Sequence, residues 1–366
     1  MKIIIDTLRY FHRIYYNICL LIKDKSFYSA DSYFPEFEDK RKTINQILID
    51  QLKNIFRCGA VENYYFHYGL DIKGLRNSKD YINANLMIYR RDELNRQTPN
   101  NHVCILRDKA LFGIFAEAYN IPTPHNIGLV KDGEIYEFST KEKSSFKSFI
   151  FKNDVDAFLK LLDGQCADGV FHIEVKNNQL IVNGNNVDFN SWAKSLERGV
   201  FLLQKSITNQ HPAISNIHPY AINTIRLITI RNLHTKEIEF FPPILRIGTG
   251  KSHVDNTTAG GIAVGIDTEN NVLREFGFMK PGHGTKTTKH PNSGVVFKDY
   301  HIPFLQEAIS LSKSFHNLLP DIHSIGWDIA ITEEGPMFIE GNDNWEISSA
   351  QACNHGLFKE YKKLFY

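Results

Sequence analysis

Three side chains near the C-terminal end of the sequence are of the types that hard divalent cations prefer. Asp328 lies in one apolar run, and Glu340 and Asn342 lie at the end of the next, with the turn-like tract TEEG between them. The two runs are expected to be antiparallel strands, with Glu340 and Asn342 on one face. Mg²⁺ takes a few such oxygen ligands and completes its shell with phosphates and water. The spacing predicts a Mg²⁺ site; the alternative is that the carboxylates are solvated strand ends.

Two arginines upstream are spaced for binding an anion. Arg226 lies in the strand-like run NTIRLITI, Arg246 in the following run, and Asn256 in the loop after it. Forked guanidinium groups on adjacent strands can hold one phosphate between them. We therefore predict a phosphate site at these residues. Surface ion pairing with the many carboxylates of the chain is the alternative.

A third cluster combines a strand lysine with a turn that contains glycines. Lys160 precedes the segment DGQCADGV, which includes Gly164 and Gly169. Backbone N–H groups of such a turn can close over phosphates, and the lysine supplies a positive charge. Taken alone, the pattern is as well explained by an ordinary hairpin.

The composition limits what kind of protein carries these clusters. The chain has 366 residues, with 42 Lys and Arg against 41 Asp and Glu. A chain of this length exceeds one hydrophobic core, so at least two lobes are expected. The balanced charge provides no general field for nucleic acid, and no nucleic-acid partner is predicted. The five cysteines form no paired motif, which favours a reducing, cytoplasmic location.

The N-terminal segment 4–22 is apolar but interrupted by charges, so a helix lying along a surface is expected there rather than one that spans a membrane. Its apolar residues recur at helical spacing. They are Ile4, Leu8, Phe11, Tyr15, Ile18 and Ile22. The first interpretation is that this stripe packs on its own protein. The second is peripheral contact with the inner face of a membrane or with a partner.

The remaining elements predict an α+β chain. A second helix is expected over 36–59, ending at Gly59, and another after Asp108, which is placed to cap it. A hairpin is expected over 157–182, and further strand-like runs follow up to residue 341. Strands cluster with helices instead of alternating strictly with them, which favours separate α+β lobes.

At this point the sequence resembles the ATP-grasp superfamily. The motifs NTIR, LRIGTG…DNTTAGG and GWDIA…FIEGN are similar to those of glutamate ligases of the RimK type, and the whole looks like the sugar-transfer-associated ATP-grasp proteins. The resemblance covers about residues 100–345. It implies two α+β lobes that clasp ATP behind a helical region. The implied limits are 1–100 for the N-terminal region, 101–203 for the lid lobe and 204–366 for the C-terminal lobe.

The resemblance also implies roles for individual residues. Contacts to ATP phosphates fall to Lys109 and Lys160, the adenine pocket to Gln204, Lys205 and Ile207, and the ribose to His211. Arg226, Arg246 and Asn256 would hold the transferring phosphate and the acyl-phosphate. One or two Mg²⁺ ions would be held by Asp328, Glu340 and Asn342.

The implied activity is ATP-dependent carboxylate–amine ligation through an acyl-phosphate, joining an amino acid to a sugar or a cell-envelope polysaccharide component. Its partners would be a small carboxylate and a small amine. The alternatives are ligation of amino acids to a peptide or protein tail, and an ATP-binding protein without turnover that serves a glycosyltransferase. A basic loop at 277–294 is a candidate for the anionic substrate, against the alternative of a solvated loop. Its basic residues are Lys280, His283, Lys286, Lys289 and His290.

Overall fold

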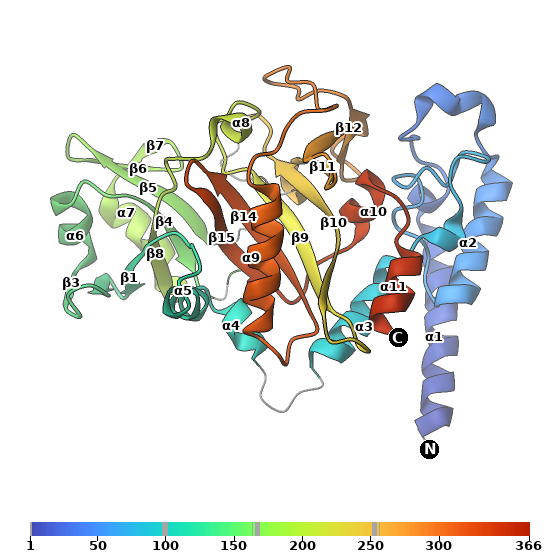
Figure 1. The fold of residues 1–366 in the computed structure, drawn as a ribbon, viewed down its shortest axis with the longest axis horizontal. Helices are drawn as coiled ribbons and strands as arrows, with labels where there is room; N and C mark the ends of the chain where they lie inside the picture. The colour runs from blue at the N-terminus through green and yellow to red at the C-terminus, as the bar shows by residue number, and fades with distance from the viewer. Residues whose placement is uncertain (1, 97–101, 163, 165–168, 251–254, 256) are drawn as a thin grey trace.

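The computed structural model describes residues 2–96, 102–162, 164, 169–250, 255 and 257–366; for 2–7 and 198 it describes the backbone alone. The described elements form an N-terminal helical region and two antiparallel sheets with helices beside them (Figure 1). The α+β class is therefore confirmed. The predicted boundary between residues 100 and 101 lies outside the described residues, and the one between 203 and 204 falls within the strand Phe201–Lys205. The domain limits therefore stay predictions.

The N-terminal region is built mainly from helices. They are α1 (Lys2–Lys23), η1 (Lys25–Phe27), η2 (Pro35–Lys40), α2 (Ile44–Cys58), η3 (Ser78–Asp80) and α3 (Ala84–Asn95). The helix predicted over 36–59 begins later, because Thr43 caps α2 through a reciprocal pair of hydrogen bonds with Gln46. It ends as predicted at Gly59, whose φ of +73° suits glycine.

Helix α1 packs on its own protein, as the first interpretation of segment 4–22 expects, but most of the predicted apolar stripe is not the packed side. Leu8, Phe11, Tyr15 and Ile22 are exposed, and Ile18 is half-buried, while the side chain of Ile4 lies outside the described part. The packed side carries Ile14 and Leu21 instead. Among the helices that the structure describes, none is both long and apolar enough to cross a membrane.

The first sheet has the strand order β3-β2-β1-β8-β4-β5-β6-β7 and is antiparallel throughout. Its elements are β1 (Asn126–Lys131), β2 (Glu134–Glu137), β3 (Lys143–Ser145), α6 (Phe146–Lys152), β4 (Asp156–Leu161), β5 (Val170–Lys176), β6 (Gln179–Val182), β7 (Asn185–Val187), α7 (Phe189–Ala193), η4 (Lys194–Arg198) and β8 (Phe201–Lys205). The predicted hairpin over 157–182 is present as β4, β5 and β6. In β4, burial alternates along part of the strand, so this sheet is covered mainly on one face.

The second sheet has the order β13-β12-β11-β10-β9-β14-β15. Its strands are β9 (Thr224–Arg231), β10 (Ile238–Ile247), β11 (Ile262–Asp267), β12 (Val272–Met279), β13 (Lys286–Thr287), β14 (Ser324–Thr332) and β15 (Gly335–Asn342). The helices beside it are α4 (Val103–Arg107), α5 (Lys109–Ala118), α8 (Pro212–Ser215), η5 (Thr257–Ala259), α9 (Leu305–Asn317), α10 (Ser348–Cys353) and α11 (Phe358–Phe365).

Both faces of the second sheet are covered by other elements, and Asp328 lies on the face turned away from α9. Trp327 and Ile329 belong to the core under α9, which crosses the sheet in Figure 1. Asp328 lies between them in the strand and therefore points to the opposite face. On that face, Ile244, Ala263 and Phe278 pack against the N-terminal region. The polar residues of the sheet are thus enclosed between the sheet and neighbouring elements.

Candidate active site

The strand register brings the predicted phosphate and metal residues to one face of the second sheet. Asp328 pairs directly with Glu340 on β15 and with Arg226 on β9. Arg246 on β10 pairs with Thr224, two residues before Arg226 and therefore on the same face. Directly opposed residues point to the same side of a sheet, so four charged side chains converge there.

Asp328 is the centre of this cluster. Arg226 donates to it in a forked arrangement, with Nε 2.6 Å from Oδ1 and Nη2 2.9 Å from Oδ2. Arg246 Nη1 lies 3.2 and 3.1 Å from the same two oxygens. The Asp328 residue is only 3% exposed, so the interpretation of a solvated strand end is excluded for it. A buried carboxylate is stable here because two guanidinium groups neutralise it.

The two carboxylates of the cluster are shifted in opposite directions. Burial opposes the charge on Asp328, but Arg226 and Arg246 outweigh it and hold the pKa of that carboxyl below its usual range. Burial and the adjacent charge of Asp328 raise the pKa of Glu340. Asn342 Nδ2 donates to Glu340 Oε1 at 3.1 Å. Glu340 therefore carries negative charge that its neighbours compensate only in part.

Arg246 has a second carboxylate partner that the sequence analysis did not single out. Its Nη2 lies 2.5 Å from Asp255 Oδ1, and Asp255 Oδ2 accepts from both the backbone N–H and the hydroxyl of Thr224. The signal was present in the sequence, since Asp255 immediately precedes the predicted Asn256. Arg246 Nε is buried and has no hydrogen-bond partner among the described residues. An unused donor beside this cluster is suited to an incoming anion.

Lys160 lies on β4 of the first sheet, and Glu340 and Lys109 both influence its charge. Its pKa is lowered by burial to about 8, with the charge of Glu340 opposing the shift and that of Lys109 adding to it. These influences place both Lys109 and Glu340 within electrostatic reach of Lys160. Lys109 Nζ donates to the backbone oxygens of Leu161 at 3.1 Å and Gly164 at 2.7 Å, which ties the start of α5 to the turn after β4.

The residues predicted to bind adenine and ribose do not form a cluster like the one around Asp328. Gln204 is buried, accepts from Lys160 Nζ at 2.7 Å and donates to Asn126 Oδ1 at 2.8 Å. Lys205 is exposed at the end of β8, and Ile207 is half-buried after it. His211 accepts from the backbone N–H of Ala213 and so caps α8. Their roles in nucleotide binding stay predictions, and Asn256 lies outside the described residues.

The basic loop at 277–294 is not assembled as one anion site. Lys280 pairs with Glu346 at 3.2 Å. Lys286 pairs with Glu36 and lies over the rings of two phenylalanines, Phe34 at 4.0 Å and Phe276 at 4.3 Å. Lys286 thus joins the loop to the N-terminal region, and ion pairing of this kind cannot be read from local sequence.

The predicted Mg²⁺ ligands fit that ion by their chemistry. The described residues contain no group of three or more His, Cys, Asp or Glu side chains arranged to hold a metal. The predicted set has two carboxylates and one amide: Asp328 pairs with Glu340, and Asn342 lies two residues farther along β15. Mg²⁺ needs no more protein ligands than this when phosphates are present. A cation would also offset the repulsion that raises the pKa of Glu340.

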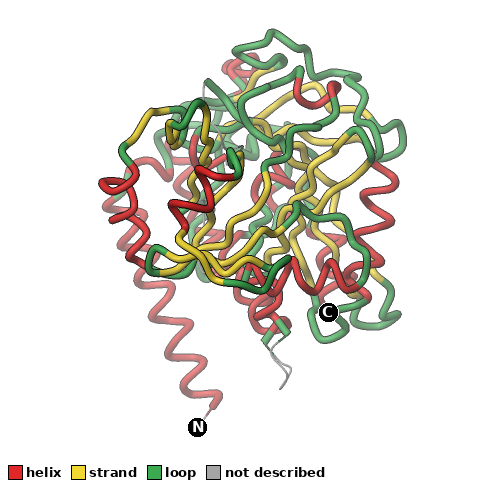
Figure 2. The backbone as a smooth tube through the Cα atoms, turned by 90° about the vertical axis from the view of Figure 1, so that its left-hand side faces the viewer, coloured by secondary structure: helices red, strands yellow, loops and turns green. Residues whose placement is uncertain are grey.

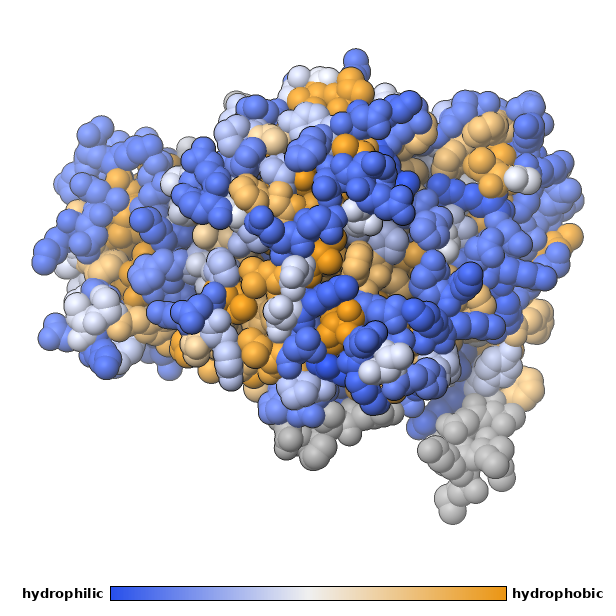
Figure 3. Space-filling model, in the orientation of Figure 1, coloured by the Kyte–Doolittle hydropathy of each residue, from blue (hydrophilic) through white to orange (hydrophobic). Residues whose placement is uncertain are grey.

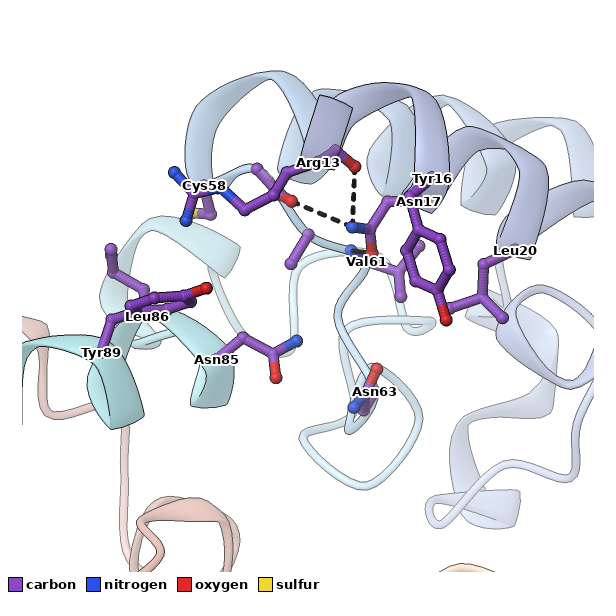
Figure 4. A pocket seen from close by; sticks show the side chains of 12 residues that line it. Arg13, Tyr16, Asn17, Leu20, Cys58, Val61, Asn63, Asn85, Leu86 and Tyr89 are labelled. Carbon is purple, nitrogen blue, oxygen red and sulfur yellow. Dashed lines mark hydrogen bonds between the residues drawn. The ribbon is translucent and has the colours of Figure 1, made fainter. Parts of the chain in front are cut away.

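A cavity of about 340 Å³ lies elsewhere, between α1, the end of α2 and α3. Figure 4 shows Arg13, Asn17 and Tyr89 among the side chains around it. No residue of the predicted active site lines this cavity. It therefore gives no support for or against the site on the second sheet.

Comparison with known proteins shows which family this chain is similar to. A family model described as sugar-transfer associated ATP-grasp matches residues 89–364, which confirms the predicted ATP-grasp fold. A comparison with curated proteins found no match.

Similar solved structures are ligases and synthetases of low sequence identity. D-Alanine–D-alanine ligase from Helicobacter pylori is 12% identical over 71% of this chain and 60% of its own, with a TM-score of 0.37. N5-carboxyaminoimidazole ribonucleotide synthetase from Thermus thermophilus is 12% identical over 72% of this chain and 53% of its own, also with a TM-score of 0.37. The chain thus spans less than two thirds of these proteins, and the match to an ADP complex of the synthetase covers 45% of that chain.

Proposed function

Because the chain belongs to the sugar-transfer-associated ATP-grasp family, whose model covers residues 89–364, we propose that it is an ATP-dependent carboxylate–amine ligase. The proposed product is an amide between an amino acid and a sugar or polysaccharide component. The family description supports the sugar as one partner. Contact of the enzyme with a membrane or a protein partner through segment 4–22 stays a prediction at this point.

One observation carries the proposal. Arg226, Arg246, Asp328 and Glu340 share one enclosed face of the second sheet, and Lys160 reaches the same region from the first sheet. Guanidinium and ammonium groups opposite paired carboxylates are the groups needed to position a triphosphate with its cation for phosphoryl transfer. Burial lowers the pKa of Lys160 to about 8, and shifts of this kind cluster at functional sites.

The proposed reaction has two steps. A carboxylate oxygen of one substrate attacks the γ-phosphorus of ATP, the bond to the bridging oxygen breaks, and ADP leaves. The amine nitrogen then attacks the acyl carbon, phosphate leaves with the electron pair of the broken C–O bond, and the nitrogen releases a proton. Positioning supplies most of the acceleration in such reactions, since the protein forms no covalent bond.

The chain's own residues bind and orient the reacting groups. Arg226 and Arg246 would hold the oxygens of the transferring phosphoryl group and of the acyl-phosphate, sharing their donors between Asp328 and the ligand. Lys160 and Lys109 would contact the phosphates of ATP. Glu340, Asn342 and Asp328 would hold Mg²⁺, which neutralises phosphate charge when bound.

The test is a ligation assay with purified full-length protein. Mg-ATP is incubated with pooled amino acids and amino sugars, and ADP, phosphate and new masses are measured. We expect ADP release that depends on both substrates, and a product equal in mass to their sum less one water. Glu340→Gln should reduce the rate more than about a hundredfold, because it removes a ligand charge at the phosphates.

The matched control is Glu333→Gln, an exposed carboxylate in the turn that joins β14 to β15. It should leave the rate unchanged. ADP release unaffected by Glu340→Gln would contradict the proposed site, and ATP binding without ADP formation under any substrate pair would contradict the proposed activity.

A further inference from the structure

One side of α1 is fixed to the body of the protein. Asn17 Nδ2 donates to the backbone oxygen of Gly59 at 3.1 Å, and Asn17 Oδ1 accepts from the backbone N–H of Val61 at 3.1 Å. Figure 4 shows Asn17 on the side of α1 that faces the cavity next to α3. Ile14 and Leu21 pack with Ile55 of α2. These contacts fix the rotation of the helix about its own axis.

The side of α1 that points away from Asn17 exposes large apolar residues in one line. Leu8 is 63% exposed, Phe11 61%, Tyr15 69% and Ile22 72%. Their spacing of three, four and seven residues places them along one stripe of the helix. Lone exposed apolar residues are ordinary, but a continuous stripe of this size marks an interaction surface.

Helix α2 extends this surface. It runs antiparallel to α1, since Tyr10 Oη donates to the backbone oxygen of Phe56 and Gln51 Nε2 donates to that of Phe27. The side of α2 that carries buried Ile47 and Asn54 faces the body. Half a turn away, Ile49 is 51% exposed, Leu52 37% and Phe56 59%.

Both stripes therefore point away from the body, side by side. We call them together the outer apolar face. It consists of Leu8, Phe11, Tyr15, Ile22, Ile49, Leu52 and Phe56. Figure 3 shows a few apolar residues, in orange, at the edge of the molecule over these helices, among mainly hydrophilic ones. Figures 1 and 2 show the N-terminal part of α1 projecting beyond the rest of the chain.

Helices α1 and α2 contain more basic than acidic residues. α1 contains four lysines and arginines against one aspartate, and α2 contains two against one, Asp50, whose carboxylate is paired with Lys42 at 2.7 Å. The whole chain, by contrast, has 42 basic against 41 acidic residues. Arg9, Lys23 and Lys53 are exposed on these helices. Exposed positive charge beside an apolar stripe complements an anionic lipid surface.

We propose that the outer apolar face docks on the surface of an anionic lipid membrane, with α1 lying in the plane of the interface. The aromatic rings of Phe11, Tyr15 and Phe56 suit the boundary between headgroups and acyl chains. Two copies packed through this face would bring the basic residues of both into one shared interface, and this repulsion disfavours self-association as the use of the face. This inference goes beyond the ligase proposal and does not depend on it.

The test uses full-length protein and flotation with vesicles. Vesicles of phosphatidylcholine mixed with phosphatidylglycerol are compared with vesicles of phosphatidylcholine alone. We expect binding to the anionic vesicles that is about tenfold stronger, given the effect of a few basic residues near the surface. Phe11→Glu with Phe56→Glu should lower it by about tenfold or more, since both side chains would leave the acyl boundary.

Ile114→Glu is the matched control, because this residue is a 52% exposed apolar side chain in the middle of another helix, α5. Far-UV circular dichroism checks that every variant is folded. Absence of flotation, equal flotation with both kinds of vesicle, or equal loss in the control would each overturn the proposal. So would a dimer seen by light scattering without vesicles and abolished by Phe11→Glu, since the face would then serve self-association.

Discussion

The charged groups of the two sheets are compensated in different ways. On the second sheet, Asp328 receives four donor contacts from two arginines, and Arg246 has a second carboxylate, Asp255. On the first sheet, Lys160 Nζ donates to Gln204, a neutral side chain. The protein itself thus balances the charge of Asp328 on the second sheet, whereas that of Glu340 is compensated only in part. The lysine of the first sheet keeps a charge that a ligand can balance.

The difference follows from burial. All nine residues of β14 are buried, so a charge on that strand needs partners for the chain to fold. β4 lies in a sheet covered mainly on one face, and its Lys160 is partly exposed. Substitutions in the second-sheet cluster should therefore change stability as well as activity. Substitutions at Lys160 should change ligand affinity first.

The largest effect is expected for Arg226→Met. This change removes the forked donor from buried Asp328 and should reduce the free energy of unfolding by about 3 kcal/mol. Urea unfolding is followed by tryptophan fluorescence in a Trp192→Phe background. The signal then comes from Trp327 and Trp345, the other two of the three tryptophans, both buried beside the second sheet.

The double change Arg226→Met with Asp328→Asn separates lost charge balance from lost packing. Because the buried charge is removed together with its partner, about half or more of the stability should return. A double variant no more stable than Arg226→Met would show that packing, not charge balance, holds this part of the sheet.

Lys160→Met is expected to act on ATP binding. Loss of a charged donor to phosphate should weaken ATP binding by about thirtyfold, equivalent to about 2 kcal/mol, as measured by calorimetry with Mg-ATP. The urea midpoint should stay within about 0.5 kcal/mol of the parent. Lys176→Met, an exposed lysine on β5, is the control and should change neither quantity. If both variants weakened ATP binding equally, the overall positive charge of the lobe, and not a contact of Lys160 with phosphate, would explain the effect.

This comparison also explains what could be predicted from the sequence. Asp328, Glu340 and the two arginines lie in strand-like runs, so their residue types and the hairpin turn were enough to bring them together. Asp255 was missed because a carboxylate in a loop gives no periodic signal, and its place next to Asn256 was the one indication of it in the sequence. The partner of Lys286 was missed because Glu36 is 250 residues away in the sequence.

The packed side of α1 could not be predicted for a physical reason. The helix has apolar residues on two adjoining stripes, and periodicity does not tell which one faces the protein. The side that contains Asn17 is packed, because its amide forms hydrogen bonds with backbone groups of residues 59 and 61. The contacts of Asn17 with the loop at residues 59–61 exist only in the folded protein, so the sequence gives no sign of them. The stripe of Leu8, Phe11, Tyr15 and Ile22 was therefore taken for the packed side.

ATP affinity should depend on pH through Lys160. Its pKa of about 8 in the free protein means that most of the population is charged at pH 7 and about a tenth at pH 9. Since the charged form binds phosphate, the dissociation constant of ATP should rise by about tenfold over this interval. Lys160→Arg keeps its charge at both values and serves as the reference for titration of ATP itself. The same slope in this variant would exclude Lys160 as the titrating group.

The smallest effect is expected for Thr224→Val, which tests the support of Arg246. The hydroxyl of Thr224 donates to Asp255, and valine fills the same volume without that donor. Asp255 keeps the backbone N–H of residue 224 at 3.0 Å, so the loss should be about 1 kcal/mol in the unfolding free energy. The control on the first sheet is Ser144→Ala, an exposed strand hydroxyl expected to cost less than about 0.5 kcal/mol. If both changes were neutral, the polar network of the second sheet would contribute no more to stability than the exposed surface of the first.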